Sequence, residues 1–231
     1  MGCPYKANGL YSRMSVGAVL LAAGAGSRLG GKPKALLELG GVPLVMRQLI
    51  ALSGAGVDEV AVVLGHYAED VEAAIGQFPI TMVRNPNPDD GQASSVRLGL
   101  EALSPKLDSV IVALADQPLV DAQDVTSLIS AFRRRGEKSM VVPRTLSSDG
   151  ISTPGNPVMF DAALREQWLA GNANLTCRNW REKHPETVFW FEPENEHFFL
   201  DIDRPEDLEH FQSSTGHTLS WPSKLLSTAQ V

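Results

Sequence analysis

The chain has little cysteine and no histidines at metal-binding spacing. Its 231 residues include two cysteines, Cys3 and Cys177, which are too few for a disulfide framework or a cysteine-rich zinc site. The five histidines are scattered, without the HxxxH or HxH spacing of zinc sites. The sequence therefore excludes a small disulfide-stapled scaffold and favours solvated or capping roles for the histidines.

Excess positive charge and long apolar runs are absent as well. A net charge of -7 argues against a general nucleic-acid binder, since such domains usually carry a basic face. No run approaches the ~20 apolar residues of a membrane span, and the first residues lack the apolar region of a signal peptide. We therefore expect a cytoplasmic protein that binds neither nucleic acid nor membrane.

Continuous aliphatic segments, typical of buried strands, alternate with segments of helical spacing. The expected strands are residues 16–24, 58–65, 80–83 and 108–116, and the expected helices are residues 43–56, 68–77, 93–103 and 121–135. This alternation predicts a mostly parallel sheet with helices on both faces, a three-layer α/β/α arrangement. Because ligands of such sheets bind at the carboxyl ends of the strands, we expect a site near Gly24, Gly65–His66 and Asp116–Gln117.

The second half of the chain is less regular. We expect strands at 138–144, 157–160, 187–193 and 197–203, helices at 161–171, 175–185 and 204–212, and a long polar loop at 146–156. With no repeat and no low-complexity linker, the sequence predicts a loose N-terminal extension (1–14), one compact domain (15–212) and a C-terminal tail (213–231).

The segment LAAGAGSRLGGKPKALL, residues 21–37, places a glycine-rich turn and three cations directly after the first strand. Gly24 and Gly26 would let backbone amides approach an anion. Arg28, Lys32 and Lys34 supply the positive charge that successive phosphates need. The segment therefore predicts a phosphate-binding loop, with a solvated basic turn as the alternative.

Two common phosphate loops fit this segment less well. A P-loop would match Gly26, Gly31 and Lys32, but Pro33 occupies the position of the metal-binding hydroxyl. A dinucleotide-binding loop would require a third glycine where Leu29 stands, and no acidic residue ends the second strand.

A third pattern fits better. The segment resembles the signature LAAGxGxRMGxxxPKxLL of nucleotidyltransferases that activate sugars, alcohols and molybdopterin. Three further segments resemble the same family in the same order: GQASSVRLGL (91–100), ALADQPLV (113–120) and FLDIDRPEDL (199–208). The resemblance implies a Rossmann-like, mostly parallel sheet of the nucleotide-diphospho-sugar transferase type, and an enzyme that transfers a nucleoside monophosphate.

The resemblance also implies roles for individual residues. It implies Mg²⁺ as cofactor, with Asp116 and Asp203 as ligands and Asp201 as a possible helper. Arg28 and Lys34 would be catalytic: Lys34 would neutralise charge at the α-phosphate, and Arg28 would hold the leaving phosphates. The nucleotide-binding residues would be Ala22, Ala23, Gly24, Ala25, Gly26, Lys32 and Ser95.

The middle of the chain narrows the implied reaction. TPGNPVMF (153–160) resembles a loop that borders the pterin in molybdenum cofactor cytidylyltransferase, which implies acceptor contacts from Gly155, Asn156 and Pro157, although Asn156 replaces a histidine. The pair Ala22–Ala23 favours CTP over GTP in this family. The implied reaction transfers CMP from CTP to the terminal phosphate of molybdopterin, releases pyrophosphate and serves a molybdenum hydroxylase client.

Alternatives stay open at this point. The acceptor could be a sugar or alditol phosphate, or the nucleotide GTP. From another class, the chain could be a non-catalytic nucleotide-binding protein that delivers a cofactor.

Overall fold

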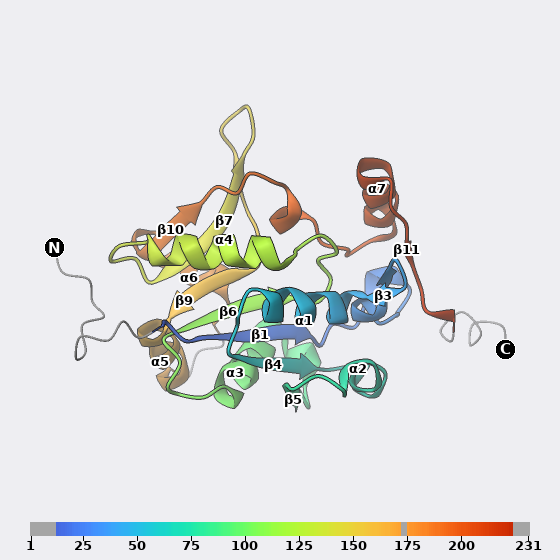
Figure 1. The fold of residues 1–231 in the computed structure, drawn as a ribbon, viewed down its shortest axis with the longest axis horizontal. Coiled ribbons are helices and arrows are strands. Elements are labelled where there is room, and N and C mark those ends of the chain that lie inside the picture. The colour runs from blue at the N-terminus through green and yellow to red at the C-terminus, as the bar shows by residue number, and fades with distance from the viewer. Residues whose placement is uncertain (1–12, 172–174, 224–231) are drawn as a thin grey trace.

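A computed structural model of the chain describes residues 13–171 and 175–223, and its core is one mixed, mostly parallel sheet (Figure 1). The strand order is β10-β7-β9-β6-β1-β4-β5, with β8 paired to β7. The strands are β1 (Val16–Ala22), β4 (Glu59–Leu64), β5 (Thr81–Arg84), β6 (Ser109–Leu114), β7 (Met140–Leu146), β8 (Ser152–Pro154), β9 (Val158–Asp161) and β10 (Val188–Phe191). The expected parallel sheet is confirmed, with β9 running antiparallel to both of its neighbours.

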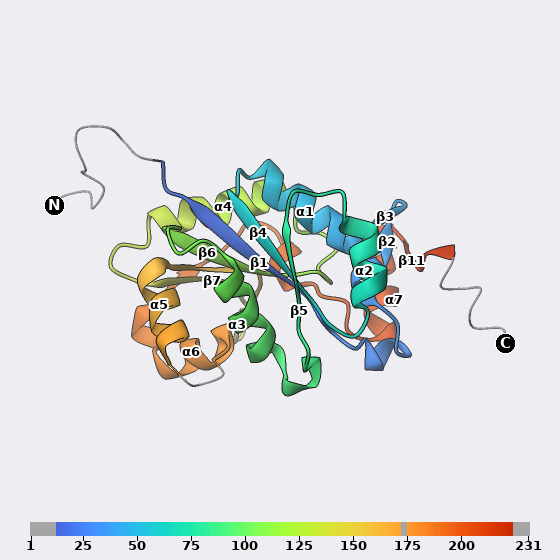
Figure 2. The same cartoon turned by 90° about the horizontal axis from the view of Figure 1, so that it is seen from below.

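Alternate residues of the central strands face opposite helical layers. In β1, Ala18 and Leu20 pack into one core, whereas Val19 and Leu21 pack into the other. The first core is covered by α1 (Leu44–Gly54), α2 (Ala68–Ile75) and α4 (Ala122–Arg133), and the second by α3 (Gln92–Ala102), α5 (Ala162–Ala170) and α6 (Cys177–Lys183). Figure 2 shows α3, α5 and α6 on the side of the sheet opposite α1 and α4, which confirms the three-layer prediction.

The loop expected at 146–156 is partly a β-hairpin. β7 runs to Leu146 and pairs antiparallel with β8, and Figure 1 shows this hairpin projecting from the body of the domain. Polar and glycine residues suggested a loop, but the hairpin needs them only at its turn.

The strand expected at 197–203 is wrong. Residues 197–199 form the short helix η5 (His197–Phe199), and irregular backbone follows. Phe198 and Ile202 are buried, but the amide of Ile202 donates to the carbonyl of Asp116 (3.1 Å) instead of entering a ladder. The segment therefore crosses the end of β6 and reaches the expected ligand site.

The expected C-terminal tail begins with ordered structure. Helix α7 (Pro205–Thr215) extends past residue 212, and β11 (Leu219–Ser220) pairs with β2 (Glu38–Leu39), which pairs with β3 (Val42–Pro43). Leu219 packs in a third cluster with Leu29 and Phe211. Residues 1–12 and 224–231 of the expected extension and tail lie outside the described residues. Among the residues described, no helix is long and apolar enough to cross a membrane.

Candidate functional site

A pocket of about 320 Å³ lies at the carboxyl ends of β1 and β6. Seven of the sequence-predicted site residues line it: Ala22, Ala23, Gly24, Lys34, Ser95, Asp116 and Asp203. Tyr67 and Asp201 line it as well. The structure therefore gathers, at the edge expected for an α/β sheet, residues that lie far apart in the sequence.

The glycine-rich loop presents unpaired amides beside this pocket. Gly26 has a φ of 58°, and a Cβ there would lie 1.9 Å from the carbonyl oxygen of Lys32, so only glycine fits. Its carbonyl accepts from the amides of Leu29 (2.9 Å) and Gly31 (3.0 Å). Within the described parts of the chain, the amides of Gly24, Ala25 and Gly26 donate to no acceptor. Successive unpaired amides of this kind can bind an anion.

Lys34 joins the two expected metal ligands. It opens the short helix η2 (Lys34–Leu36), and its Nζ lies 2.5 Å from Asp116 Oδ2 and 2.5 Å from Asp203 Oδ1. Burial by itself lowers the pKa of Lys34, but Asp116 and Asp203 outweigh it, so the pKa lies above its usual range. The ammonium group is therefore charged at neutral pH and neutralises two carboxylates 87 positions apart in the numbering.

The acidic side of the pocket has oxygen atoms left for a cation. Asp116 Oδ1 is buried and has no hydrogen-bond partner. Asp201 lines the same pocket, where burial, together with Asp116 and Asp203, raises its pKa. Hard carboxylate oxygens converging on one point suit Mg²⁺, so these residues fit the cofactor expected from the sequence.

At the other end of the pocket, Ser95 is oriented by a buried asparagine. Asn85 Nδ2 donates to the Oγ of Ser95 (2.9 Å) and of Ser94 (2.9 Å), while Asn85 Oδ1 accepts from the amide of Asn87 (2.9 Å). Because Ser95 Oγ accepts from Asn85, its own proton can point into the pocket. Asn85 was missed in the sequence, although it follows a strand end.

The remaining predicted residues lie outside the pocket lining. Arg28 is largely exposed, and its guanidinium lies 3.4 Å from Asp203 Oδ2. Lys32 Nζ lies 5.3 Å from the ring centroid of Trp221. Ala25 and Gly26 continue the loop beside the pocket without lining it.

The expected acceptor loop is linked to the site through Gln117. The side chain of this buried residue donates from Nε2 to the carbonyls of Asn156 (3.0 Å) and Phe198 (3.1 Å). The amide of Asn156 also donates to Phe198 O (2.9 Å). Gly155 to Pro157 therefore lie next to the end of β6 but not in the pocket lining.

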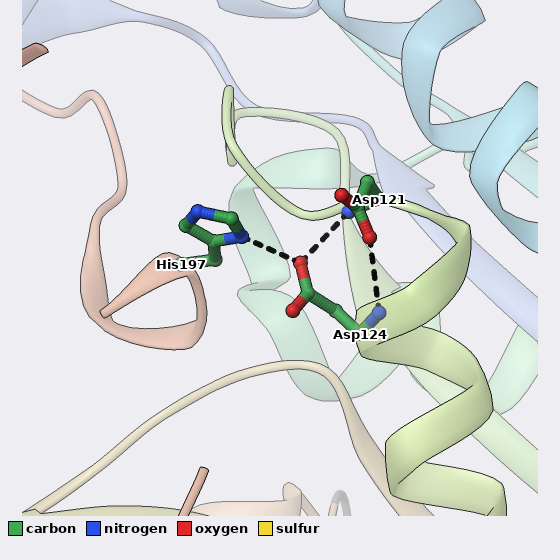
Figure 3. Close-up of side chains that lie close together, drawn as sticks. All are labelled: Asp121, Asp124 and His197. Atoms are coloured by element: carbon green, nitrogen blue, oxygen red, sulfur yellow. Dashed lines mark hydrogen bonds and ion pairs between the residues drawn. The ribbon is translucent and has the colours of Figure 1, made fainter. Parts of the chain in front are cut away.

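A second group of acidic residues, Asp121, Asp124 and His197, lies at the start of α4 (Figure 3). Both oxygens of Asp124 already accept hydrogen bonds: Oδ1 from Asn195 Nδ2 (2.7 Å), and Oδ2 from His197 Nδ1 (2.8 Å) and the amide of Asp121 (3.0 Å). Asp121 accepts from the first amides of the helix, as expected for its cap. The group therefore caps α4 and anchors the segment before η5, and it fits a cation less well than the pocket does.

Fold and site together define a nucleotide-binding α/β protein with an acidic cation site at its strand ends. Residues 18–188 match the model of the MobA-like NTP transferase domain, and the chain belongs to this nucleotidyltransferase family. Asp203 lies beyond the matched range.

Individual relatives agree with this assignment. The chain is 38% identical over 147 residues to nicotine blue oxidoreductase of Paenarthrobacter nicotinovorans, covering 64% of this chain and 71% of that one. It is 30% identical to bifunctional protein GlmU of Acetivibrio thermocellus over 71% of this chain but 35% of GlmU. A solved nucleotidyl transferase from Methanothermobacter thermautotroptrophicus superposes with a TM-score of 0.68 at 28% identity, covering 87% of this chain and 97% of that one.

Proposed function

We propose that the protein transfers CMP from CTP to the terminal phosphate of molybdopterin and releases pyrophosphate, with Mg²⁺ held by Asp116 and Asp203. The observation that carries the proposal is the convergence of Lys34 and these two carboxylates beside a loop with unpaired amides. Cations and amides suit the triphosphate, and the carboxylates suit the metal that accompanies it.

The reaction needs positioning and charge stabilisation more than covalent chemistry from the protein. The loop amides would hold the phosphates, Lys34 would neutralise charge developing at the α-phosphate, and Arg28 would hold the departing pyrophosphate. Bound Mg²⁺ would supply further neutralisation of phosphate oxygens. Arg28 is exposed at the pocket rim, where its long side chain can reach a leaving group.

The choice of base and acceptor is supported more indirectly. Ala22 and Ala23 line the pocket, and Ser95 offers a hydroxyl proton, which suits the carbonyl oxygen of a cytosine. Asn156 and its neighbours adjoin Asp116 through Gln117, so an acceptor phosphate bound there would face the carboxylates. A molybdenum hydroxylase would be the client of the product.

A second candidate follows from the relative that is named an oxidoreductase and is 38% identical. In this reading the same pocket binds an organic substrate that is reduced or oxidised, and no nucleotide is transferred. A sugar or alditol phosphate acceptor, GTP in place of CTP, and nucleotide binding without turnover complete the set that an experiment has to separate.

The test incubates the purified protein with Mg²⁺, each of the four nucleoside triphosphates, and either molybdopterin or a panel of sugar and alditol phosphates, and measures pyrophosphate. We expect release with CTP and molybdopterin. Release with sugar phosphates alone, or with GTP alone, would replace the acceptor or the nucleotide. Nucleotide binding without pyrophosphate would indicate a delivery protein, and oxidation of NADH or NADPH with an added organic acceptor would indicate the redox function.

A further inference from the structure

The tripeptide Gly65–His66–Tyr67 follows β4, one of the strand ends where the sequence predicts ligands, and has no role so far. Gly65 lies against the glycine-rich loop: a Cβ there would be 2.4 Å from the carbonyl oxygen of Ala23 and 2.8 Å from its Cα. Both atoms belong to the backbone and cannot move aside as a flexible side chain would. Glycine at position 65 therefore allows the end of β4 to approach the loop this closely.

The next two side chains bind carbonyl groups of that loop. His66 Nδ1 lies 3.2 Å from Ala23 O and, since a carbonyl only accepts, the ring nitrogen donates. The Tyr67 hydroxyl lies 3.1 Å from Ala25 O and also contacts Gly31 O. His66 Nε2 contacts Asp89 (3.1 Å), in the short helix η3 (Pro88–Asp90). The loop is thus held at both ends of its turn from the β4 side.

These carbonyl contacts determine where the loop amides point. In a planar trans peptide, the carbonyl of one residue and the N–H of the next point in opposite directions. With the carbonyls of Ala23 and Ala25 turned towards His66 and Tyr67, the amides of Gly24 and Gly26 are turned away from them. These are two of the amides that donate to no acceptor among the residues described.

We propose that His66 and Tyr67 are positioning residues, which fix the loop so that its amides face the phosphates of the nucleotide. This inference rests on the proposed function, because it assumes that the loop binds a triphosphate. Neither side chain has to touch the phosphates, and the effect of each acts through the backbone. A side chain that served only stability would affect all ligands of the pocket alike, whereas a positioning residue affects the phosphate end.

The experiment uses inorganic tripolyphosphate with Mg²⁺ as the probe and isothermal titration calorimetry as the assay. Tyr67→Phe removes only the hydroxyl, and His66→Phe keeps a ring but removes both ring nitrogens. We expect each variant to bind tripolyphosphate about tenfold more weakly, the effect of about one lost hydrogen bond, while the free nucleoside that the wild type binds keeps its affinity. Thr126→Val is the matched control, because the Thr126 hydroxyl also donates to a backbone carbonyl (Ala122 O, 2.7 Å), in α4 away from the pocket.

The outcomes separate the two proposals. If the wild type does not bind tripolyphosphate or any nucleotide, the proposed function fails. If the wild type binds and both variants bind equally well, the positioning role is refuted while the proposed function stands. Equal weakening of tripolyphosphate and nucleoside would also refute it, since that result indicates a general structural role. If one variant does not fold, the other decides.

Discussion

Replacing Lys34 with methionine would remove the ammonium group between Asp116 and Asp203 while keeping a side chain of similar length. In the wild type this group competes with a metal ion for the same oxygens, because Nζ lies 2.5 Å from one oxygen of each carboxylate. Lys34→Met should therefore bind a divalent cation more tightly and yet turn over more slowly. Opposite signs for the two effects make the prediction specific.

The size of each effect follows from the burial of the pair. Two unit charges 4 Å apart interact by about 1 kcal/mol in water and about 4 kcal/mol at an effective dielectric constant near 20. The side chains of Lys34 and Asp116 are only 16% and 18% exposed, so the repulsion removed lies between these limits. A change above about 1.4 kcal/mol corresponds to at least tenfold tighter binding. Loss of preorganised charge at the α-phosphate should lower turnover by ~10²–10³-fold.

Mn²⁺ binding to the nucleotide-free protein, followed by electron paramagnetic resonance, measures the first effect, and pyrophosphate release measures the second. Lys32→Met is the matched control. It removes the same charge from the same loop, but the ammonium of Lys32 lies over Trp221 and forms no ion pair with Asp116 or Asp203 among the described residues. Unchanged or weaker Mn²⁺ binding in Lys34→Met would refute the assignment of these carboxylates as the cation site.

Three further predictions concern single side chains. Asp116→Asn should lower Mg²⁺-dependent pyrophosphate release at least ~10²-fold, with an unchanged circular dichroism spectrum; full turnover would remove Asp116 from the site. Ser95→Ala should weaken nucleotide binding about tenfold in calorimetry, without changing tripolyphosphate binding, whereas a loss for both ligands would contradict a contact to the base. Burial raises the pKa of Cys177 to about 12, so its thiolate is scarce and alkylation by iodoacetamide should be slow at pH 8 and accelerate as the pH rises. Peptide mass mapping of native and urea-unfolded protein measures this, and rapid modification of native Cys177 at pH 8 would contradict it.

The sequence allowed prediction of the residues whose positions depend on strand ends. Lys34, Ser95 and Asp116 follow or adjoin buried aliphatic strands, and parallel strands bring such positions to one edge. The alternation of Ala18 and Val19 between two cores explains why continuous apolar runs signalled strands covered on both faces. The main predicted helices also appear, because helical spacing and the cap at Asp121 are local signals.

The sequence could not reveal residues that act through distant backbone groups. Asn85, Gln117 and Tyr67 bind partners whose positions depend on how separate segments meet, and no spacing pattern records this. The error at 197–203 has the same cause: the apolar residues there resemble a strand, but the amide of Ile202 finds its acceptor at Asp116 instead of on a neighbouring strand.

Residues beyond the matched family range complete this site. Gln117 must present its amino group to the carbonyls of Asn156 and Phe198, because its oxygen would face two other acceptors if the amide were reversed. One side chain thereby ties the end of β6 to both the expected acceptor loop and the segment that leads to Asp203. Asp203 is held in turn by its amide, which donates to Asp207 in α7 (2.8 Å). The carboxylate pair around Lys34 thus depends on a C-terminal segment outside residues 18–188, so truncation before α7 should abolish cation binding even though every strand of the central sheet is retained.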